Sequence, residues 1–188
     1  MRIIVGITGA SGALYALELL RHLRADGHEI HTVVSAHGWQ LLEHECGIGK
    51  EAVAALSSSL HDNENLGASI ASGSFRTQAM IIVPCSMRTL AAVASGLADN
   101  LICRAADVMI KERKNLVLAV RETPLSAIHL ENMLKLARLG VGIMPLSPAF
   151  YHHPQSINEL ATALAGRIMD SLGIPNEICK RWEGVAPR

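Results

Sequence analysis

Aromatic side chains are scarce in this sequence, whose 188 residues include two tryptophans, two tyrosines and two phenylalanines. Hydrophobic residues still make up 49% of the chain, and charged residues only 18%. That balance excludes an intrinsically disordered protein and predicts a compact one with small aliphatic residues in its core. The same richness in small aliphatic residues suits extra buried surface between subunits, as in an oligomer.

An excess of charge of either sign is also missing, because Lys+Arg and Asp+Glu both number 17. Proteins whose main task is to bind nucleic acid or an anionic membrane carry a basic excess, so this class is disfavoured. No apolar run approaches the ~18 residues of a membrane span. The N-terminus enters an apolar strand at once, without the h-region of a signal peptide. We therefore expect a cytoplasmic protein with no nucleic-acid or membrane partner.

The four cysteines form neither a metal-binding nor a disulfide pattern. None stands in a CxxC motif, and no histidine spacing completes a zinc-binding pattern with them. The pair His152-His153 has no third ligand at a useful spacing. We expect reduced thiols, as in a cytoplasm, and no metal.

Short, apolar, β-branched runs alternate with helical patterns along the chain. Strands that are apolar on both faces are typical of a parallel sheet covered by helices on both sides. The sequence predicts one α/β domain over residues 1–188, a doubly wound, Rossmann-like, mostly parallel sheet with a tail from about residue 174. The predicted strands are 3–7, 29–35, 79–83, 116–120 and 141–146; the predicted helices are 13–24, 39–46, 86–95, 103–113, 128–139 and 156–172; residues 47–68 are expected to hold a short helix between loops.

In an open parallel sheet the ligand crevice lies beyond the carboxyl ends of the strands. Small residues follow the first two predicted strands, Thr8–Gly12 after one and Ser35 after the other. The spacing Gly6-x-x-Gly9-x-x-Gly12 is neither GxGxxG nor a P-loop. Ser35 also stands where an acidic residue would hold an adenosine ribose. NAD is therefore disfavoured, and the glycine-rich loop taken alone could be only a tight turn.

Two turns rich in hydroxyl groups and glycine flank the third predicted strand. Ser72–Ser74 precedes that strand, and Ser86, Arg88 and Thr89 follow it. Such turns suit a monophosphate, because glycine permits close backbone approach and a helix N-terminus offers free N–H groups. FMN carries one phosphate, a ribityl chain that needs hydroxyl and amide partners, and a ring that needs a flat apolar slot. The two turns therefore favour FMN.

Six motifs occur in order: Gly6–Gly12 (GITGASG), Ala71–Ser74 (ASGS), Pro84–Thr89 (PCSMRT), Arg104–Glu112 (RAADVMIKE), Arg121–Met133 (RETPLSAIHLENM) and Phe150–Pro154 (FYHHP). Together they resemble the UbiX-type flavin prenyltransferases, some of whose relatives are called phenolic or aromatic acid decarboxylase subunits. The resemblance extends from residue 3 to about residue 182 and is weakest over residues 47–68.

The resemblance implies a metal-independent transferase that joins a dimethylallyl group from dimethylallyl phosphate to N5 and then C6 of reduced FMN. Whether the donor is a mono- or a diphosphate stays open. The product, prenylated FMN, is the cofactor of a separate decarboxylase. The resemblance also implies a homododecamer with its site between subunits.

The residues that this resemblance assigns to the site fall into three groups. Those implied to contact FMN are Gly9, Ala10, Ser11, Ser35, Ser86, Met87, Arg88, Thr89 and Arg121. Those implied to surround the prenyl phosphate are Arg104, Lys111, Glu122, Tyr151 and Arg167. Those implied to lie near the reacting carbons are Ser11, Glu45 and Trp182. The catalytic set is Ser11, Glu45, Lys111, Glu122, Tyr151 and Trp182.

The residue types fit the departure of a phosphate. A phosphate monoester leaves poorly, so without a metal the protein must supply cations and proton donors around it. Arg104, Lys111 and Arg167 supply positive charge, and Tyr151 can donate a hydrogen bond. Glu122 would orient one of these cations or share a proton with the phosphate.

The other half of the reaction is an allylic cation and the loss of a proton. An aromatic face stabilises a cation, which suits Trp182 and the flavin itself. Removal of the C6 proton needs a base, for which there are two candidates. One is Glu45 together with Ser11, and the other is the departing phosphate.

Two alternatives remain at this point. An FMN-dependent decarboxylase of cysteine conjugates would have a similar fold, but such enzymes carry Pro-Ala-Ser-Ala-Asn-Thr where this chain has Pro84–Thr89, so Arg88 replaces an Asn. A non-catalytic FMN carrier, or subunit of a decarboxylase complex, would explain the FMN contacts. It would leave the cationic residues around the prenyl phosphate without a role.

Overall fold

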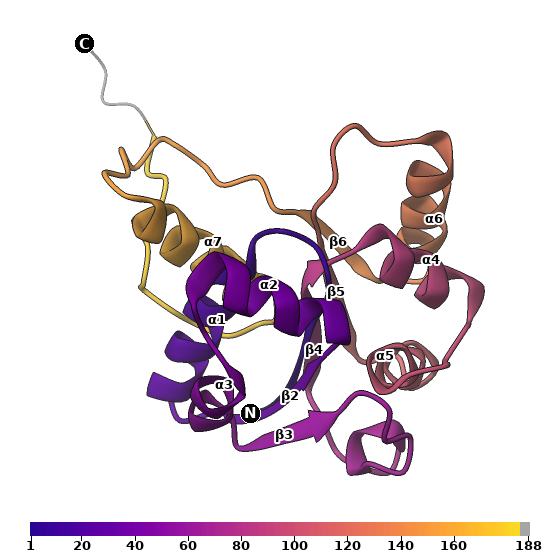
Figure 1. Cartoon of the computed structure of the whole chain (residues 1–188). Helices are drawn as coiled ribbons and strands as arrows, with labels where there is room; N and C mark the ends of the chain where they lie inside the picture. The colour runs from indigo at the N-terminus through magenta and orange to yellow at the C-terminus, as the bar shows by residue number, and fades with distance from the viewer. Residues whose placement is uncertain (185–188) are drawn as a thin grey trace.

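The computed structural model of the protein describes residues 1–184 and centres on one six-stranded sheet (Figure 1). All neighbouring strands are parallel, in the order β3-β2-β1-β4-β5-β6. In this doubly wound order the direction of winding reverses between β1 and β4, and ligands bind at that point. The strands are β1 (Arg2–Ile7), β2 (Glu29–Val34), β3 (Ser59–Asp62), β4 (Ala79–Cys85), β5 (Asn115–Val120) and β6 (Gly142–Pro145).

Aliphatic residues fill both faces of the central strands. All seven residues of β4 are buried, and five of the six in β1 are buried. Because side chains alternate along a strand, Ile3 and Val5 pack into one hydrophobic cluster while Ile4 packs into another on the opposite face. A strand of this kind has no solvent-facing side, which is why its sequence is continuously apolar.

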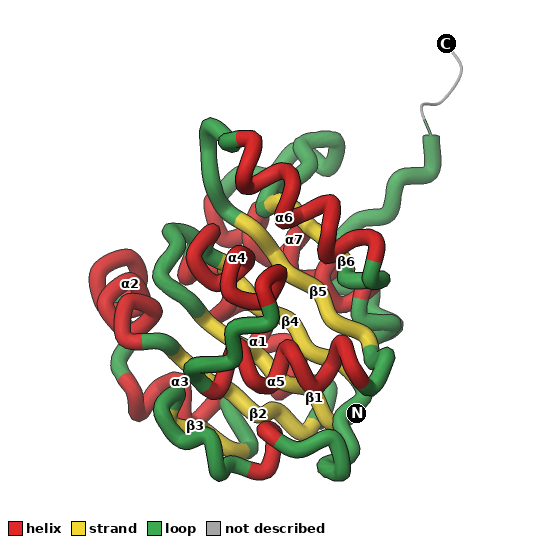
Figure 2. Tube along the Cα trace, turned by 90° about the vertical axis from the view of Figure 1, so that its right-hand side faces the viewer, coloured by secondary structure: helices red, strands yellow, loops and turns green. Residues whose placement is uncertain are grey.

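Helices cover each face of the sheet with one of these clusters. Figure 2 shows α4, α5 and α6 lying over the strands on one face, and the other cluster joins α1, α2, α3 and α7. The fold class predicted from the sequence is therefore confirmed. The helices are α1 (Ala13–Ala25), α2 (Ala36–Cys46), α3 (Lys50–Leu56), α4 (Met87–Ser95), α5 (Leu101–Lys111), α6 (Ala127–Arg138) and α7 (Ile157–Ser171), with a short 3-10 helix at Ser69–Ala71.

The predicted helices and strands all form, but the stretch 47–68 was interpreted wrongly. It holds the helix α3 as expected and then a sixth strand, β3, that the sequence analysis did not predict. β3 is four residues long and has no fully buried residue, and among residues 1–184 it pairs with β2 alone. Its sequence SLHD lacks the apolar, β-branched pattern of the other strands because it lies at the edge of the sheet.

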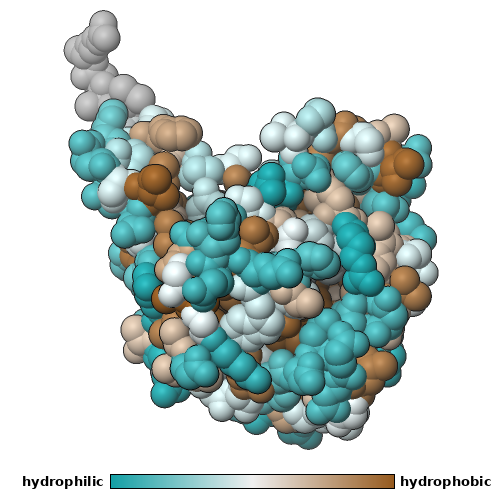
Figure 3. Space-filling view, in the orientation of Figure 1, coloured by the Kyte–Doolittle hydropathy of each residue, from teal (hydrophilic) through white to brown (hydrophobic). Residues whose placement is uncertain are grey.

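Helix α6 carries several exposed apolar side chains. Ile128, Leu130 and Leu134 of this helix are each more than half exposed. Figure 3 shows mixed polar and apolar side chains, and a hollow at the top between the α6 side and the side of the C-terminal tail. Within residues 1–184, none of the helices has the length and apolar character needed to cross a membrane.

Candidate functional site

Three helices begin around one cavity at the carboxyl ends of β1, β2 and β4. The cavity, which we call the cap cavity, has a volume of about 660 Å³. Ser35 caps α2 by accepting a hydrogen bond from the backbone N–H of Gly38, Ser86 caps α4 through Thr89, and Asn100 caps α5 through Cys103. The residues that line it are Thr8, Gly9, Ser35, Ala36, His37, Asn63, Glu64, Ser86, Arg88, Thr89, Asp99 and Asn100.

The helix ends at the cap cavity suit an anion, and the cavity is also lined by the carboxylates of Glu64 and Asp99. The first N–H groups of a helix have no partner within the helix, and the helix dipole places partial positive charge at that end. Three such ends converge here, so a phosphate would meet several unused donors. Arg88 adds a full charge at the rim, where its Nη2 donates to Asp99 Oδ2 at 3.1 Å.

The buried hydroxyl of Thr8 holds this arrangement together. It donates to the carbonyl oxygen of Pro84 at 2.7 Å and accepts from the backbone N–H of Ser86 at 2.9 Å. The backbone N–H of Thr8 also donates to Pro84. Thr8 thus joins the ends of β1 and β4 and sets the point at which α4 begins.

The loop Thr8–Gly12 also borders a second cavity, of about 710 Å³, which we call the Ser11 cavity. Apolar side chains supply much of its wall, and Ser11, Glu45 and Arg121 supply polar groups. Gly9 lines one cavity and Ser11 the other, so both cavities border the same loop. The residues that line the Ser11 cavity are Ser11, Gly12, Leu14, Tyr15, Leu17, Arg21, Glu45, Cys46, Ile48, Arg121, Leu146, Ile157 and Asn158.

Glu45 of α2 caps the first turn of α1. The N-cap residue of α1 is Gly12, with φ of 112°, which has no side chain to satisfy the helix. Oε2 of Glu45 instead accepts the backbone N–H groups of Gly12 at 2.9 Å and Ala13 at 2.8 Å. Burial raises the pKa of this carboxyl, but hydrogen bonds from Ser11, Gly12 and Ala13 together lower it below its usual range, and Arg121 acts in the same direction. Glu45 is therefore ionised at neutral pH.

Arg121 offers a free donor to a ligand in the Ser11 cavity. It follows β5, and its Nε is buried without a hydrogen-bond partner among the described residues. A buried donor without a partner is costly and calls for a ligand or water to satisfy it. The adjacent Glu122 is exposed and accepts a hydrogen bond from the backbone N–H of Thr123 at 3.0 Å.

The residues implied to bind FMN therefore lie along one loop and two cavities. Gly9, Ser35, Ser86, Arg88 and Thr89 line the cap cavity, while Ser11 and Arg121 line the Ser11 cavity. Ala10 is buried between them in the loop, and Met87 is the first residue of α4. The fit to FMN is good: helix ends for one phosphate, a loop that spans both cavities, and an apolar wall with an unpaired arginine donor for the ring.

The residues implied to bind the prenyl phosphate do not come together in one chain. Arg104 lies on α5, where its Nε donates to the Ala71 carbonyl at 3.2 Å and its Nη1 to Asp107 at 2.8 Å. Lys111 ends the same helix and pairs with Glu112. Tyr151 and Arg167 lie elsewhere, on the Phe150 loop and on α7, and α7 covers the opposite face of the sheet from α5.

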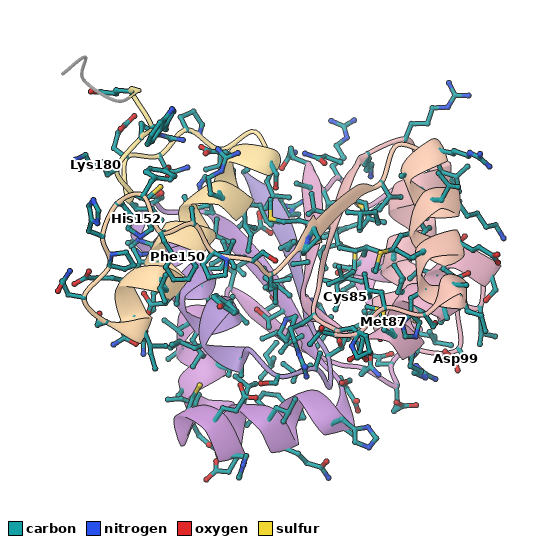
Figure 4. The ribbon with its side chains drawn as sticks, turned by 90° about the horizontal axis from the view of Figure 1, so that it is seen from above. Cys85, Met87, Asp99, Phe150, His152 and Lys180 are labelled. Atoms are coloured by element: carbon teal, nitrogen blue, oxygen red, sulfur yellow. The ribbon has the colours of Figure 1, made fainter. Side chains whose placement is uncertain are left out.

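Tyr151, Arg167 and Trp182 form a third group. Tyr151 and Arg167 border a cavity of about 210 Å³, the tail cavity. The Tyr151 hydroxyl donates to the carbonyl of Lys180 at 3.2 Å, and the Trp182 ring lies edge-on to Tyr151 with centroids 5.3 Å apart. Figure 4 shows that the region of the cap cavity and the region of the tail cavity lie on opposite sides of the chain. Cys85, Met87 and Asp99 mark the first region, and Phe150, His152 and Lys180 mark the second.

The turn Ser72–Ser74 does not share an anion site with Ser86. It precedes β4, whereas Ser86 follows it, and it does not line the cap cavity. The hydroxyls of Ser72 and Ser74 instead bond each other at 2.8 Å. Gly73 packs so close to the end of α5 that an added Cβ would lie 2.9 Å from the Lys111 amine. Within one chain the two turns therefore lie at opposite ends of β4 and do not border one cavity.

The sequence analysis missed several residues of the cap cavity. Asn63 follows the unpredicted strand β3, and its carbonyl and side-chain oxygens accept the backbone N–H groups of Leu101 and Ile102 at the start of α5. No local pattern identifies such a residue. Asn100 did carry a signal, because an asparagine directly before an apolar helical run is a favoured N-cap.

Comparisons with known proteins agree with this geometry. Residues 1–171 match the Flavoprotein family. The flavin prenyltransferase LpdB of Lactiplantibacillus plantarum is 52% identical over 185 residues, which cover 97% of this chain and 98% of that protein. The crystal structure of AnUbiX (PadA1) in complex with FMN and dimethylallyl pyrophosphate superposes with a TM-score of 0.96 at 44% identity, covering 98% of each chain. A dodecameric FMN-dependent UbiX-like decarboxylase from Escherichia coli O157:H7 superposes with a TM-score of 0.95 at 45% identity, covering 98% of this chain and all of that one.

Replacement of Thr8 by valine should weaken both the fold and flavin binding. Valine keeps the shape of the threonine side chain, but the backbone N–H of Ser86 loses its acceptor. This loss should lower the free energy of unfolding by about 1–3 kcal/mol. Thr8→Ser keeps the hydroxyl and is the matched control. Urea unfolding and FMN titration of both variants measure the effect. If the valine variant matched the wild type in both stability and FMN affinity, the hydroxyl would not organise the site.

The cap that Glu45 places on α1 should depend on pH. Because the pKa of Glu45 is lowered in the folded chain, its ionised form stabilises the fold, and this contribution is lost as pH falls below the ordinary value of 4.5. The stability advantage of the wild type over Glu45→Gln should be constant from about pH 7 to pH 5 and shrink at lower pH. Unfolding titrations measure it, with the exposed Glu43→Gln of the same helix as control. An advantage that persists unchanged at about pH 3 would contradict this role.

Proposed function

The chain belongs to the Flavoprotein family, among the UbiX-like flavin prenyltransferases, and from that membership we propose its reaction. The protein transfers the dimethylallyl group of dimethylallyl phosphate to N5 and C6 of reduced FMN and produces prenylated FMN. The carbon–oxygen bond of the donor breaks, and the phosphate departs with the electron pair. C1 of the allyl group bonds to N5, which loses its proton. A proton then adds to C2 of the remaining double bond, C3 bonds to C6, and the proton on C6 is lost. The chain acts as one flavoprotein domain with a tail from about residue 174.

The observation that carries this proposal is the convergence of three capped helix ends on the cap cavity, beside a loop that opens into a second cavity with an apolar wall. A phosphate in the cap cavity leaves the ring of FMN to lie across the Thr8–Gly12 loop in the Ser11 cavity. The flavin supplies the two nucleophilic positions, N5 and C6. Ser86, Arg88 and Thr89 hold the phosphate, and Arg121 offers its free Nε–H to the ring.

Glu45 and Ser11 would act beside the reacting carbons. The carboxylate of Glu45 is fixed by two backbone N–H groups and keeps its negative charge at neutral pH. A fixed negative charge stabilises positive charge that develops on the departing allyl group. A lowered pKa makes Glu45 a weak base, so its role in removing the C6 proton depends on relay through Ser11 or on the phosphate itself.

Lys111, Arg104, Arg167 and Tyr151 would stabilise the departing phosphate, and Glu122 would orient these cations. Because one chain holds these residues on opposite faces of its sheet, we infer that neighbouring copies of the chain complete each site. The exposed apolar residues of α6 support such contacts, and the E. coli relative is dodecameric. We propose the same homododecamer for this protein.

The alternatives are less well supported. A carrier of FMN would leave the arginines of the phosphate group without a role, and the LpdB relative is itself a flavin prenyltransferase. A cysteine decarboxylase would have an Asn where Arg88 stands. We further infer that the protein works in the cytoplasm, where its four free cysteines stay reduced, and that its product serves a separate decarboxylase.

The reaction is tested by anaerobic incubation of the protein with reduced FMN and dimethylallyl phosphate, followed by mass spectrometry of the released flavin. A flavin heavier by one prenyl unit is the expected product. The same incubation with dimethylallyl diphosphate identifies the donor. Unmodified FMN from both, with flavin shown to be bound, would overturn the transferase and favour a carrier.

The assignment of the cap cavity to the flavin phosphate predicts a selective effect of Arg88→Ala. FMN affinity should fall about tenfold, because a charge-assisted hydrogen bond is lost. Riboflavin, which lacks the phosphate, should bind both proteins equally. Fluorescence titration of each flavin measures this, with the exposed Arg24→Ala as a control for loss of one positive charge. An equal loss of affinity for both flavins would remove Arg88 from the phosphate site.

A further inference from the structure

One carboxylate on α7 fastens the C-terminal segment, residues 174–184, to the rest of the chain. Oδ2 of Asp170 accepts hydrogen bonds from Arg167 at 2.8 Å and from Arg181, which lies eleven residues further along. Oδ1 of Asp170 accepts from the side-chain amide of Asn176 at 3.0 Å. The second nitrogen of the Arg181 fork donates to the carbonyl oxygen of Asn176. Asp170 and Arg181 therefore close a loop in the tail.

The tail also packs directly on the α7 backbone. Gly166 faces it, and a Cβ there would lie 2.9 Å from Cys179 Sγ and 3.0 Å from Ile178. Asn176 is buried and donates to the carbonyl of Gly166 at 3.2 Å, while Ile174 joins the hydrophobic core. The first half of the segment is thus anchored by packing, and Arg181 anchors the second half.

The Asp170–Arg181 pair is partly shielded from water. The two side chains are 22% and 37% exposed. The hydrogen bond from Arg181 lowers the pKa of the Asp170 carboxyl, although burial opposes it, and the charges of both arginines contribute. The Asp170 carboxylate therefore stays charged at neutral pH. The guanidinium group of Arg181 donates to two oxygens of the chain and so fixes the direction of the C-terminal segment.

What this pair positions is the group of Tyr151, Arg167 and Trp182. Trp182 follows Arg181 directly and lies edge-on to Tyr151. The Tyr151 hydroxyl donates to Lys180, the residue before Arg181. Arg167 shares its carboxylate partner with Arg181. Movement of Arg181 would therefore displace the ring, the phenol and the guanidinium together.

We propose that Arg181, held by Asp170, is a positioning residue for the prenyl-donor half of the site. This inference rests on the proposed function, in which Tyr151, Arg167 and Trp182 contact the donor. Arg181 itself touches neither flavin nor donor. It fixes the tail on α7 so that an aromatic ring and a phosphate-binding pair are presented together to the allyl phosphate.

The test separates donor binding from flavin binding. In Arg181→Ala, KM for dimethylallyl phosphate should rise about tenfold, since the fork holds the tail by charge-assisted hydrogen bonds. The dissociation constant of FMN should stay the same, because the cap cavity and the Ser11 cavity contain no residue of the tail. Arg181→Lys keeps the charge without the fork and should recover part of the lost affinity. Glu177→Ala, which removes an exposed charge from the same segment, should match the wild type.

The link through Asp170 is tested by a double-mutant cycle. The increase in KM for Arg181→Ala should shrink markedly in a background that already carries Asp170→Ala, because the partner is gone. Wild-type KM in a folded Arg181→Ala oligomer would overturn the proposal, as would an equal loss of flavin affinity. If Arg181→Ala does not assemble, the Arg181→Lys variant provides the test. An unchanged KM for dimethylallyl phosphate in that variant would overturn the proposal. Absence of prenylated flavin from the wild type would instead refute the proposed function.

Discussion

The ligand-binding edge of the sheet depends on the hydrogen bonds of one hydroxyl group, that of Thr8. It joins the ends of β1 and β4 at the point where the winding of the sheet reverses. With Ser86 fixed there, α4 begins beside the starts of α2 and α5, and three helix ends face one cavity. A neutral chain without a basic excess thereby obtains a local site with several helix-end N–H donors and Arg88, in a cavity that Glu64 and Asp99 also line.

Two carboxylates shape the rest of the candidate site by holding backbone or arginine groups. Glu45 closes the start of α1, whose N-cap glycine has no side chain, and in doing so lies in the Ser11 cavity. Asp170 gathers two arginines and the tail on α7. Both have lowered pKa values because hydrogen-bond donors surround them. In the function that we propose, the separation of α5 from α7 means that neighbouring copies of the chain complete each donor site.

The sequence was sufficient to predict the parallel sheet, because its central strands are apolar on both faces and turn residues follow them. It was also sufficient to predict Ser35 and Ser86 at strand ends, where a small hydroxyl is a helix cap. It could not predict β3, whose edge position needs no apolar pattern, or Asn63, which depends on β3. It could not show that Ser72–Ser74 and Ser86 lie at opposite ends of β4 in one chain, because both turns are close to this strand in the sequence. The contacts of Arg181 are long-range within the fold and have no local signal.

In the function that we propose, the cap cavity holds the phosphate of the flavin while the ring lies in the Ser11 cavity. A crystal structure of the protein with FMN tests this most directly. Our account predicts the phosphate among the N-termini of α2, α4 and α5, within hydrogen-bond distance of Ser86, with the ring beside Ser11 and Arg121. A flavin phosphate bound instead between Tyr151 and Arg167 in the tail cavity would contradict the account.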